Sequence, residues 1–320
     1  AVLVLEQADL SDTVTVGSGL EHIPEVCLHI KEGEQYRLKD LLTAMMLRSY
    51  NDVAVCLAEY ISGSTEAFCQ MMTEKAAQIG AENTVFATPN GLDSSYTLEE
   101  HHSTAEDMAL IARYALENET FREIIATKEI IFSDLSGSRS FSVTNADQFL
   151  SYPGALGVKT GFTNRAGHCF VGAAQREDIY LVSTVLGSGW GSRGKEAKWT
   201  DTKKLMEYGF QNYTNETVVT EGEDFGEISV SSSPTEIVSI EAEKDYALLL
   251  SEEEQVELVA DYPESMEAPV YAGGQVGTLS VYLNRECLEE IPLVATEDAL
   301  RYTLLQRLLR LMDQWCILYF

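Results

Sequence analysis

Apolar residues recur at helical spacing through the first two thirds of this 320-residue chain. Leucines and methionines stand three and four residues apart before Ser49, and a second apolar run follows Asn51. This spacing is typical of amphipathic helices, and glycine or a Ser/Thr cap marks several of their ends. The pattern predicts helices over residues 38–62 with a break at Ser49-Tyr50-Asn51, over 66–79, over 104–118 and over 195–208.

Strand signals lie between these helices. β-Branched and aromatic residues mark four short segments. They cover residues 129–133, 140–144, 169–175 and 179–186, and the last two form a hairpin that turns at Arg176-Glu177-Asp178. Strands mixed with helices predict an α/β (α+β) domain, a sheet flanked by helices, over residues 1–212.

The pattern changes in the last third of the chain. Residues 213–294 hold short alternating segments separated by turns rich in Gly, Pro and acidic residues, which predicts a small all-β domain. Residues 295–320 carry an apolar stripe of leucines that ends in Trp315 and Phe320. Three arginines occupy the other side of this stripe: Arg301, Arg307 and Arg310. We interpret 295–320 as an amphipathic helix that anchors the protein at a membrane surface; a helix docked on its own domain or on a partner is the alternative.

The net charge of the chain limits the classes of partner that it can bind. The sequence has 22 Lys and Arg against 51 Asp and Glu, a net charge of −29. Nucleic acid is excluded as a partner because phosphate binding needs clustered cations. The six cysteines are scattered and no His or Cys group has metal-site spacing. We therefore expect no metal and no cofactor, and we interpret His101, His102 and His168 as loop and strand residues.

Lys159-Thr160-Gly161-Phe162-Thr163 is the first segment with candidate chemistry. On an edge strand, the Lys159 ammonium and the Thr160 hydroxyl would face a cleft, where a fixed cation suits a ligand that ends in a carboxylate. Gly161 has no side chain, so a substrate backbone could approach there as an extra strand. The alternative is an ordinary strand that ends in a turn.

Ser49-Tyr50-Asn51 is the second such segment. A serine hydroxyl can relay a proton, and an asparagine amide can both donate to and accept from a peptide group. Ser and Asn are also favoured helix caps, which is the alternative interpretation.

The order and context of these segments resemble the D-alanyl-D-alanine carboxypeptidases, the low-molecular-mass penicillin-binding proteins. The resemblance is carried by LKDLLTAMMLRSYNDVAVCLAE at 38–59, by residues 88–92, 103–107 and 157–163, and by Ala166-Gly167. The β-rich segment and the tail are similar to that family's C-terminal domain and membrane anchor. The resemblance therefore implies a β-lactamase/transpeptidase-like domain followed by these two parts.

The resemblance also implies a mechanism. A serine in Ser-x-x-Lys attacks the last peptide bond of a peptidoglycan stem that ends in D-Ala-D-Ala, with the lysine as its base. D-Ala leaves, and water releases the acyl-enzyme. The implied roles are a proton relay for Ser49, substrate-amide binding for Asn51, carboxylate binding for Lys159, Thr160 and Lys198, and an oxyanion-hole N–H from Phe162. An ordinary solvated lysine is the alternative for Lys198.

The chain departs from the family pattern in two places. Residues 1–6 resemble the end of the helix that follows Ser-x-x-Lys, so we expect the nucleophile and its base upstream of Ala1, in an N-terminal part missing from this sequence. Ser192-Arg193-Gly194-Lys195 matches the letters, but we interpret it as a chance match in a glycine-rich loop. Tyr50 stands where family members mostly carry glycine, which could narrow the cleft.

These observations predict a penicillin-sensitive serine D-Ala-D-Ala carboxypeptidase that acts outside the cytoplasmic membrane and lies peripherally on its outer face. Its expected partners are the peptidoglycan stem peptide, β-lactam antibiotics and the membrane surface. The alternative is a non-catalytic, membrane-tethered peptidoglycan-binding protein. A β-lactamase is a weaker third hypothesis.

Overall fold

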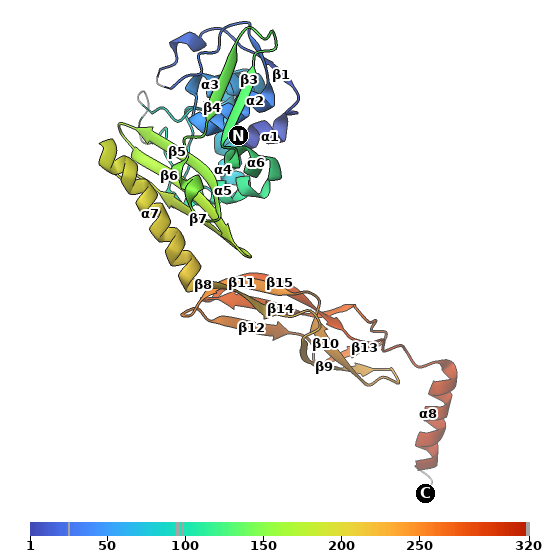
Figure 1. Cartoon of the computed structure of the whole chain (residues 1–320). Helices are drawn as coiled ribbons and strands as arrows, with labels where there is room; N and C mark the ends of the chain where they lie inside the picture. The colour runs from blue at the N-terminus through green and yellow to red at the C-terminus, as the bar shows by residue number, and fades with distance from the viewer. Residues whose placement is uncertain (25, 94–96, 98, 318–320) are drawn as a thin grey trace. The chain divides into compact units, whose positions relative to one another are not determined.

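The computed structural model describes residues 1–317 except 25, 94–96 and 98. The chain forms two compact units, Ala1–Gln211 and Asn212–Phe320. Each is described below by itself, with the element labels of Figure 1.

The first unit is built from helices and small antiparallel sheets. Its helices are α1 (Val2–Gln7), α2 (Leu38–Arg48), α3 (Asn51–Ser62), α4 (Thr65–Gln78), α5 (Ala105–Glu117), α6 (Glu119–Ala126) and α7 (Gly191–Asn212). Short 3-10 turns cover Leu20–His22 and Gln148–Ser151. Its strands are β1 (Thr13–Thr15), β2 (Gln35–Arg37), β3 (Glu129–Ser133), β4 (Ser140–Thr144), β5 (Ala155–Thr163), β6 (Gly167–Arg176) and β7 (Ile179–Val185).

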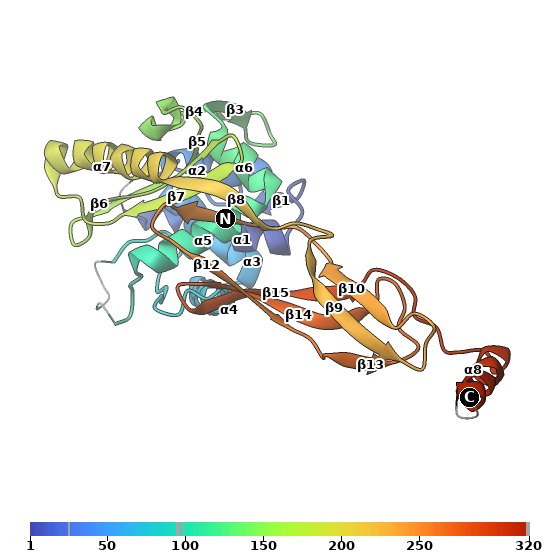
Figure 2. The ribbon, with the colours of Figure 1, turned by 90° about the horizontal axis from the view of Figure 1, so that it is seen from below.

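The sheet β5-β6-β7 lies between two groups of helices. Val158 and Ala173 pack with α5 and α6 on one face. Phe170 packs with Trp199 and other α7 residues on the opposite face. Both faces are therefore covered, as in other layered folds, and Figure 2 shows α7 and α5 on either side of this sheet.

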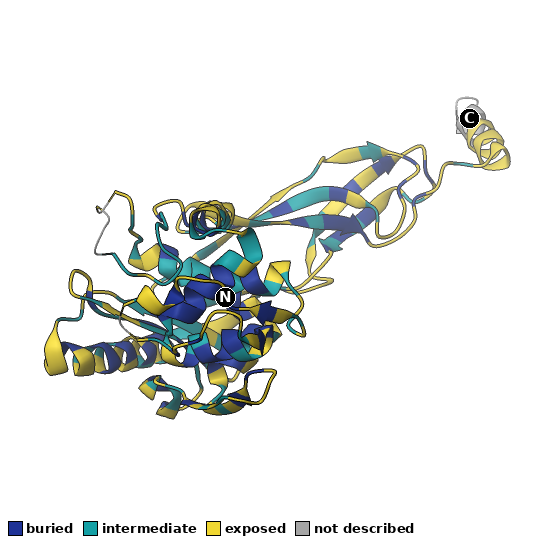
Figure 3. Cartoon of the chain, turned by 90° about the horizontal axis from the view of Figure 1, so that it is seen from above, coloured by how far each residue is buried: buried dark blue, intermediate teal, exposed yellow. Residues whose placement is uncertain are grey.

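The core of the first unit centres on α2 and α3. Leu41 and Leu42 of α2 and Val53 of α3 are fully buried, and every residue from Asn51 to Ala58 is buried. A helix buried along its whole first half cannot face solvent on one side. Helices α1, α2 and α4, strand β1 and the 3-10 turn Leu20–His22 pack around α3, and the hairpin β3-β4 packs on α2. Figure 3 shows buried stretches of the ribbon gathered in the middle of this unit.

The structure agrees with several expected element bounds. Strands β3 and β4 occupy the residues that the sequence predicts. Helix α5 begins at its predicted cap, where the Thr104 hydroxyl accepts a hydrogen bond from the Asp107 N–H at 3.0 Å. Glu177 lies in the β6-β7 turn with φ +52°, a left-handed conformation that suits a tight hairpin.

Helix α7 differs from its prediction at both ends. It starts at Gly191 and continues through Gly209 to Asn212, whereas the sequence pattern indicated 195–208. Gly209 does not end the helix, because it makes room for packing: a Cβ there would lie 2.5 Å from Leu181 Cδ1. The segment from Ser192 to Lys195 is therefore the first turn of α7, and the prediction of a glycine-rich loop was wrong.

Gly194 allows the start of α7 to approach the preceding loop. A Cβ at this position would lie 2.2 Å from the carbonyl carbon of Gly189 and 2.8 Å from its Cα. Backbone atoms cannot move aside as a side chain can, so glycine is required there despite its low helix propensity.

We expect Gly194→Ala to lower the free energy of unfolding by about 2 kcal/mol or more, because the added methyl forces α7 away from the loop. Urea denaturation measures this change. Ser192→Ala, two residues away on the exposed side of the same turn, is the control and should stay within about 0.5 kcal/mol of the wild type. Equal stability of Gly194→Ala and the wild type would contradict the close-approach role of Gly194.

The second unit is an all-β domain followed by a helix. Its strands are β8 (Tyr213–Val219), β9 (Asp224–Ser231), β10 (Ile237–Ala242), β11 (Tyr246–Ser251), β12 (Val256–Asp261), β13 (Ser265–Glu267), β14 (Gln275–Leu283) and β15 (Glu286–Ala295). Six of them form a sheet in the order β12-β14-β15-β10-β9-β13, and β11 pairs with β8. Ile240, Leu279 and Ile291 are fully buried in its core.

The C-terminal helix α8 (Leu304–Ile317) begins later than the sequence pattern indicated. Ala299 is fully buried in the β core and forms a bridge with Val270. The Arg301 guanidinium donates to the Ala268 carbonyl at 2.6 Å. Residues 295–303 thus belong to the β domain, and Arg301 does not lie on the helix.

Helix α8 is exposed on every side over the residues whose side chains the structure describes, 304–312 (Figure 3). Leu304 is 79% exposed and Leu305 is 68% exposed. The side chain of Trp315 and all of Phe320 lie outside the described residues. Among the described residues, no helix has the length and apolar character needed to cross a membrane.

Candidate active site

The first wall of the site is the turn between α2 and α3. Ser49 adopts the left-handed conformation, with φ +61° and ψ +41°, and its N–H donates to the Met45 carbonyl at 2.7 Å. Glycine or asparagine usually occupies such a helix end, because a side chain costs free energy there. A serine held in this conformation is an outlier of the kind that clusters at functional sites.

The second wall is strand β5, which carries Lys159. The Lys159 ammonium donates a hydrogen bond to Ser49 Oγ at 2.7 Å and another to the Thr160 carbonyl at 2.9 Å. Ser49 and Lys159 are 110 residues apart in the sequence. The structure therefore brings the two sequence motifs into direct contact.

Lys159 lies in an electrostatic setting that disfavours its charge. Burial, and then the positive charge of Lys198, lower the pKa of Lys159 to about 8, while Asp147 opposes this shift. Lys198 comes from α7 and is only 5% exposed, with Nζ 4.5 Å from the centroid of the Trp199 ring. Burial lowers the pKa of Lys198 as well. The two partly desolvated ammonium groups repel one another, and an anionic ligand near them would relieve this repulsion.

Asp147 is a charged member of this group that the sequence analysis missed. Its Oδ1 accepts from the Phe149 N–H at 2.8 Å and caps the 3-10 turn before β5. Among the described residues its Oδ2 is buried without a hydrogen-bond partner. Burial raises the pKa of Asp147 to about 6, against the attraction of Lys198 and Lys159. In the sequence an aspartate before a turn indicates only an ordinary cap, so no signal pointed to the site.

The outer edge of β5 is open. In the described part of the chain β5 pairs only with β6. Among the described residues, none other than Gly161 and its two chain neighbours has an atom within 4 Å of the position where a Cβ of Gly161 would stand. Phe162 is 47% exposed, and its ring lies 4.4 Å from the ring of His168 on β6. An extended peptide can therefore approach this edge as an additional strand.

Asn51 lies beside Ser49 as the first residue of α3. It is 7% exposed, and its side-chain amide donates to the Pro24 carbonyl at 3.3 Å. Its backbone N–H donates to the Val26 carbonyl at 2.9 Å. The preceding loop thus holds Asn51 in place at the edge of the site.

The other candidate groups lie elsewhere. His101 accepts a hydrogen bond from the Ala87 N–H through Nδ1, and His102 forms a bridge with Val85. Over the residues that the structure describes, no three His, Cys, Asp or Glu side chains are grouped so that they could hold a metal ion. Ser192 and Lys195 are both exposed on the first turn of α7. A serine nucleophile and its base must be enclosed in a site that excludes water, and these two residues are not.

Comparison with known proteins identifies the family to which this chain belongs. A family model described as D-alanyl-D-alanine carboxypeptidase matches residues 2–189. The chain belongs to the D-alanyl-D-alanine carboxypeptidase family. A second model, described as the penicillin-binding protein 5 C-terminal domain, matches residues 213–300.

Curated relatives carry the same family name. The chain is 27% identical over 323 residues to the D-alanyl-D-alanine carboxypeptidase DacF of Bacillus subtilis, covering 98% of this chain and 81% of the relative. It is 35% identical over 211 residues to DacB2 of Mycobacterium tuberculosis, covering 66% of this chain and 70% of the relative. The serine-peptidase chemistry of this carboxypeptidase family is consistent with the site, and a non-catalytic binding protein is not favoured.

Solved structures agree with the fold. Penicillin-binding protein 5 from Haemophilus influenzae superposes with a TM-score of 0.71 at 24% identity, over 94% of this chain and 86% of that one. The D-alanyl-D-alanine carboxypeptidase from M. tuberculosis superposes with a TM-score of 0.60 at 33% identity, over 66% of this chain and 78% of that one. The expected penicillin-binding-protein fold with an all-β C-terminal domain is thereby confirmed.

We expect Asp147→Asn to stabilise the protein at pH 8 by about 1 kcal/mol, with allowance for partial exposure, and to lose this advantage as the pH falls from 6 to 4. The wild-type carboxyl has a raised pKa in the folded state, so its ionisation opposes folding at high pH and no longer does so when it is protonated. Asparagine keeps the cap on the Phe149 N–H. Thermal unfolding across this pH range measures the difference, and a pH-independent difference would contradict the burial of this charge.

Proposed function

We propose that this protein removes the terminal D-Ala from peptidoglycan stem peptides through a serine acyl-enzyme, and that β-lactams acylate the same serine. The hydrogen bond between Lys159 Nζ and Ser49 Oγ is the single observation that carries the proposal. It unites a hydroxyl able to relay a proton with an ammonium whose pKa is lowered to about 8. A group that titrates near the working pH can take part in proton transfer in either direction.

We propose the following roles for the other residues. Lys159 and Lys198 flank the space that we assign to the substrate carboxylate, with Thr160 beside them on the strand. Gly161 leaves room for the substrate backbone along the open edge of β5. The N–H of Phe162 faces the developing oxyanion in this scheme, and Asn51 binds the substrate amide.

We propose that Ser192 is not the nucleophile of this scheme. The only Ser-x-x-Lys in the chain, Ser192 to Lys195, is exposed on α7. An apolar cavity of about 300 Å³ lies against the Lys159 side chain, and its lining includes Val2 of α1, Met46 of α2 and Phe68 of α4.

Covalent labelling with a fluorescent penicillin tests this assignment. We expect no labelling of the printed chain and stable labelling of a form extended upstream through Ser-x-x-Lys. In the extended form, Lys159→Ala should slow acylation at least about 100-fold, since it removes a charged donor from the site. Lys203→Ala, at an exposed position of α7, is the matched control and should label normally. Labelling of the printed chain that disappears in Ser192→Ala would assign the nucleophile to Ser192 and contradict the proposal.

We also propose that α8 holds the protein on the outer face of the cytoplasmic membrane. Family members act on the cell wall, which agrees with extracytoplasmic action. Helix α8 adds leucines and Met312 on one side and Arg307 and Arg310 on the other, and the structure describes no part of the chain that covers them. Exposed apolar side chains opposite arginines favour burial at a lipid interface.

Sedimentation with lipid vesicles tests the anchor. Wild-type protein should bind vesicles, and Leu308→Asp should bind at least about tenfold more weakly, because it removes an apolar contact and adds a charge to the lipid-facing side. Leu258→Asp, which changes a partly exposed leucine of β12, is the control. Equal binding of Leu308→Asp and the wild type would exclude α8 as the anchor.

A further inference from the structure

Strand β12 leaves one edge of the six-stranded sheet in the second unit open. It is the first strand in the order of this sheet, and in the part of the chain that the structure describes it pairs only with β14 (Figure 1). All six of its residues pair with β14 in one continuous register, and none of them is a proline. Every second N–H and C=O group of such a strand points away from the sheet, so β12 offers a row of backbone groups with which another strand can pair.

The inner face of β12 is apolar and uncovered. Leu258 lies opposite Val281 of β14, and Ala260 lies opposite Leu279. Val281 and Leu279 are fully buried, whereas Leu258 is 36% exposed and Ala260 is exposed as well. Residues directly opposite one another share a face of the sheet, so burial is lost within one strand spacing. A strand added beside β12 would cover Leu258 with its own inward-facing side chain.

The outer face of β12 is acidic. Glu257 and Asp261 lie opposite Tyr282 and Thr278 of β14, and both acidic residues are exposed. Among the described residues neither of them forms an ion pair. More carboxylates stand before and after the strand in the sequence, which makes this edge strongly negative. They belong to Glu252, Glu253, Glu254 and Glu264.

This charge favours a basic occupant of the edge over a second copy of the chain. The cations of residues 213–300 are Lys244, which pairs with Glu289 at 2.6 Å, and Arg285, which lies in the β14-β15 turn. Two copies of the chain each have a net charge of −29 and would repel one another. Like charges across an interface oppose association, whereas lysine or arginine at the facing positions favours it.

We propose that the open edge of β12 binds an extended segment of a partner protein in which basic residues alternate with apolar ones. The backbone of this segment pairs with β12 as an additional strand. Its apolar side chains cover Leu258 and Ala260, and its basic side chains face Glu257 and Asp261. In strand addition the main-chain hydrogen bonds supply affinity and the alternating side chains supply specificity. The proposal concerns the second unit alone and does not depend on the proposed carboxypeptidase activity.

The experiment uses the full chain labelled with ¹⁵N. The probe is an acetylated and amidated peptide in which lysine alternates with valine over the length of β12. We expect hydrogen exchange to slow about tenfold or more at the β12 amides that point away from β14, because carbonyls of the peptide accept from them. A peptide of the same composition with all lysines before all valines keeps the charge but loses the alternation. It should bind at least about tenfold more weakly.

The chain offers a matched pair of charge reversals. Glu257→Lys places a cation on the proposed edge and should weaken binding of the alternating peptide about fivefold or more. Glu227→Lys makes the same change at an exposed position of β9, which lies between β10 and β13 in the same sheet. Binding by this control should stay within about twofold of the wild type. Both side chains are exposed, so both variants should fold.

Slower exchange on β12, together with a loss of affinity in Glu257→Lys alone, would support the proposal. Equal binding of the two peptides, or equal weakening by Glu227→Lys, would show only a general attraction between opposite charges and would overturn it. Absence of binding, or slower exchange confined to other strands, would overturn it too. Sedimentation equilibrium of the free chain tests the other occupant. A dimer whose β12 amides exchange more slowly than those of the monomer would assign the edge to a second copy and exclude the basic segment.

Discussion

The arrangement of the first unit depends on one charged contact, the ammonium of Lys159 against the hydroxyl of Ser49. A lysine enclosed by protein loses much of its hydration, so it needs other polar groups to remain acceptable there. Ser49 and the Thr160 carbonyl supply hydrogen bonds, and Asp147 supplies a compensating charge without direct contact. The helix end at Ser49 and the strand at Lys159 must therefore stay in register with one another for this charge to be tolerated.

The charges of Lys159, Lys198 and Asp147 offset one another only in part. Lys198 lowers the pKa of Lys159, and Asp147 raises it by a smaller effect. Within the described part of the chain Asp147 Oδ2 is buried without a hydrogen-bond partner, and burial raises the pKa of this carboxyl to about 6. A buried polar group without a hydrogen-bond partner lowers the stability of the free protein. The positive charge of Lys159 and Lys198 that Asp147 does not offset can attract the carboxylate of a ligand. This is the usual exchange of stability for function at a site.

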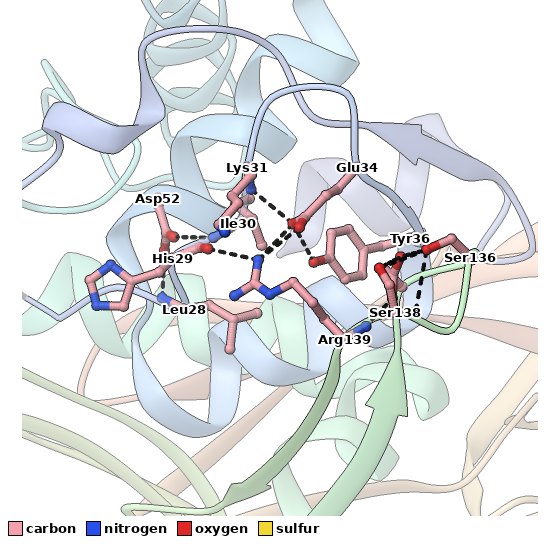
Figure 4. A network of polar contacts seen from close by, with 11 residues as sticks. Leu28, His29, Ile30, Lys31, Glu34, Tyr36, Asp52, Ser136, Ser138 and Arg139 are labelled. Atoms are coloured by element: carbon pink, nitrogen blue, oxygen red, sulfur yellow. Dashed lines mark hydrogen bonds and ion pairs between the residues drawn. The ribbon is translucent and has the colours of Figure 1, made fainter.

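Side chains outside the site hold the backbone next to it. Asp52 and Arg139 bind, from opposite sides, the loop between the 3-10 turn Leu20–His22 and β2 (Figure 4), and this loop in turn contacts Asn51. Glycines permit close approach where a helix meets a loop, as Gly194 does against Gly189. The functional side chains thus stand on rigid elements, and secondary contacts determine their orientation.

Much of the secondary structure, and the family, could be predicted from the amino-acid sequence alone. Strands β3 and β4, the Thr104 cap and the motif residues Ser49, Asn51 and Lys159 all follow from local pattern or from resemblance, because hydrophobic period and capping chemistry are short-range properties. Three-dimensional packing alone decided the rest. Gly209 lies within α7 because Leu181 packs against it, and Arg301 lies in the β domain because Ala299 is buried there. The charge effect of Asp147 on Lys159, and the hydrogen bonds of Asp52 with the Leu28 and Ile30 N–H groups, join segments far apart in the chain, and no local signal encodes such distances. Burial and charge act through space, so the lowering of the Lys159 pKa arises only in the folded protein.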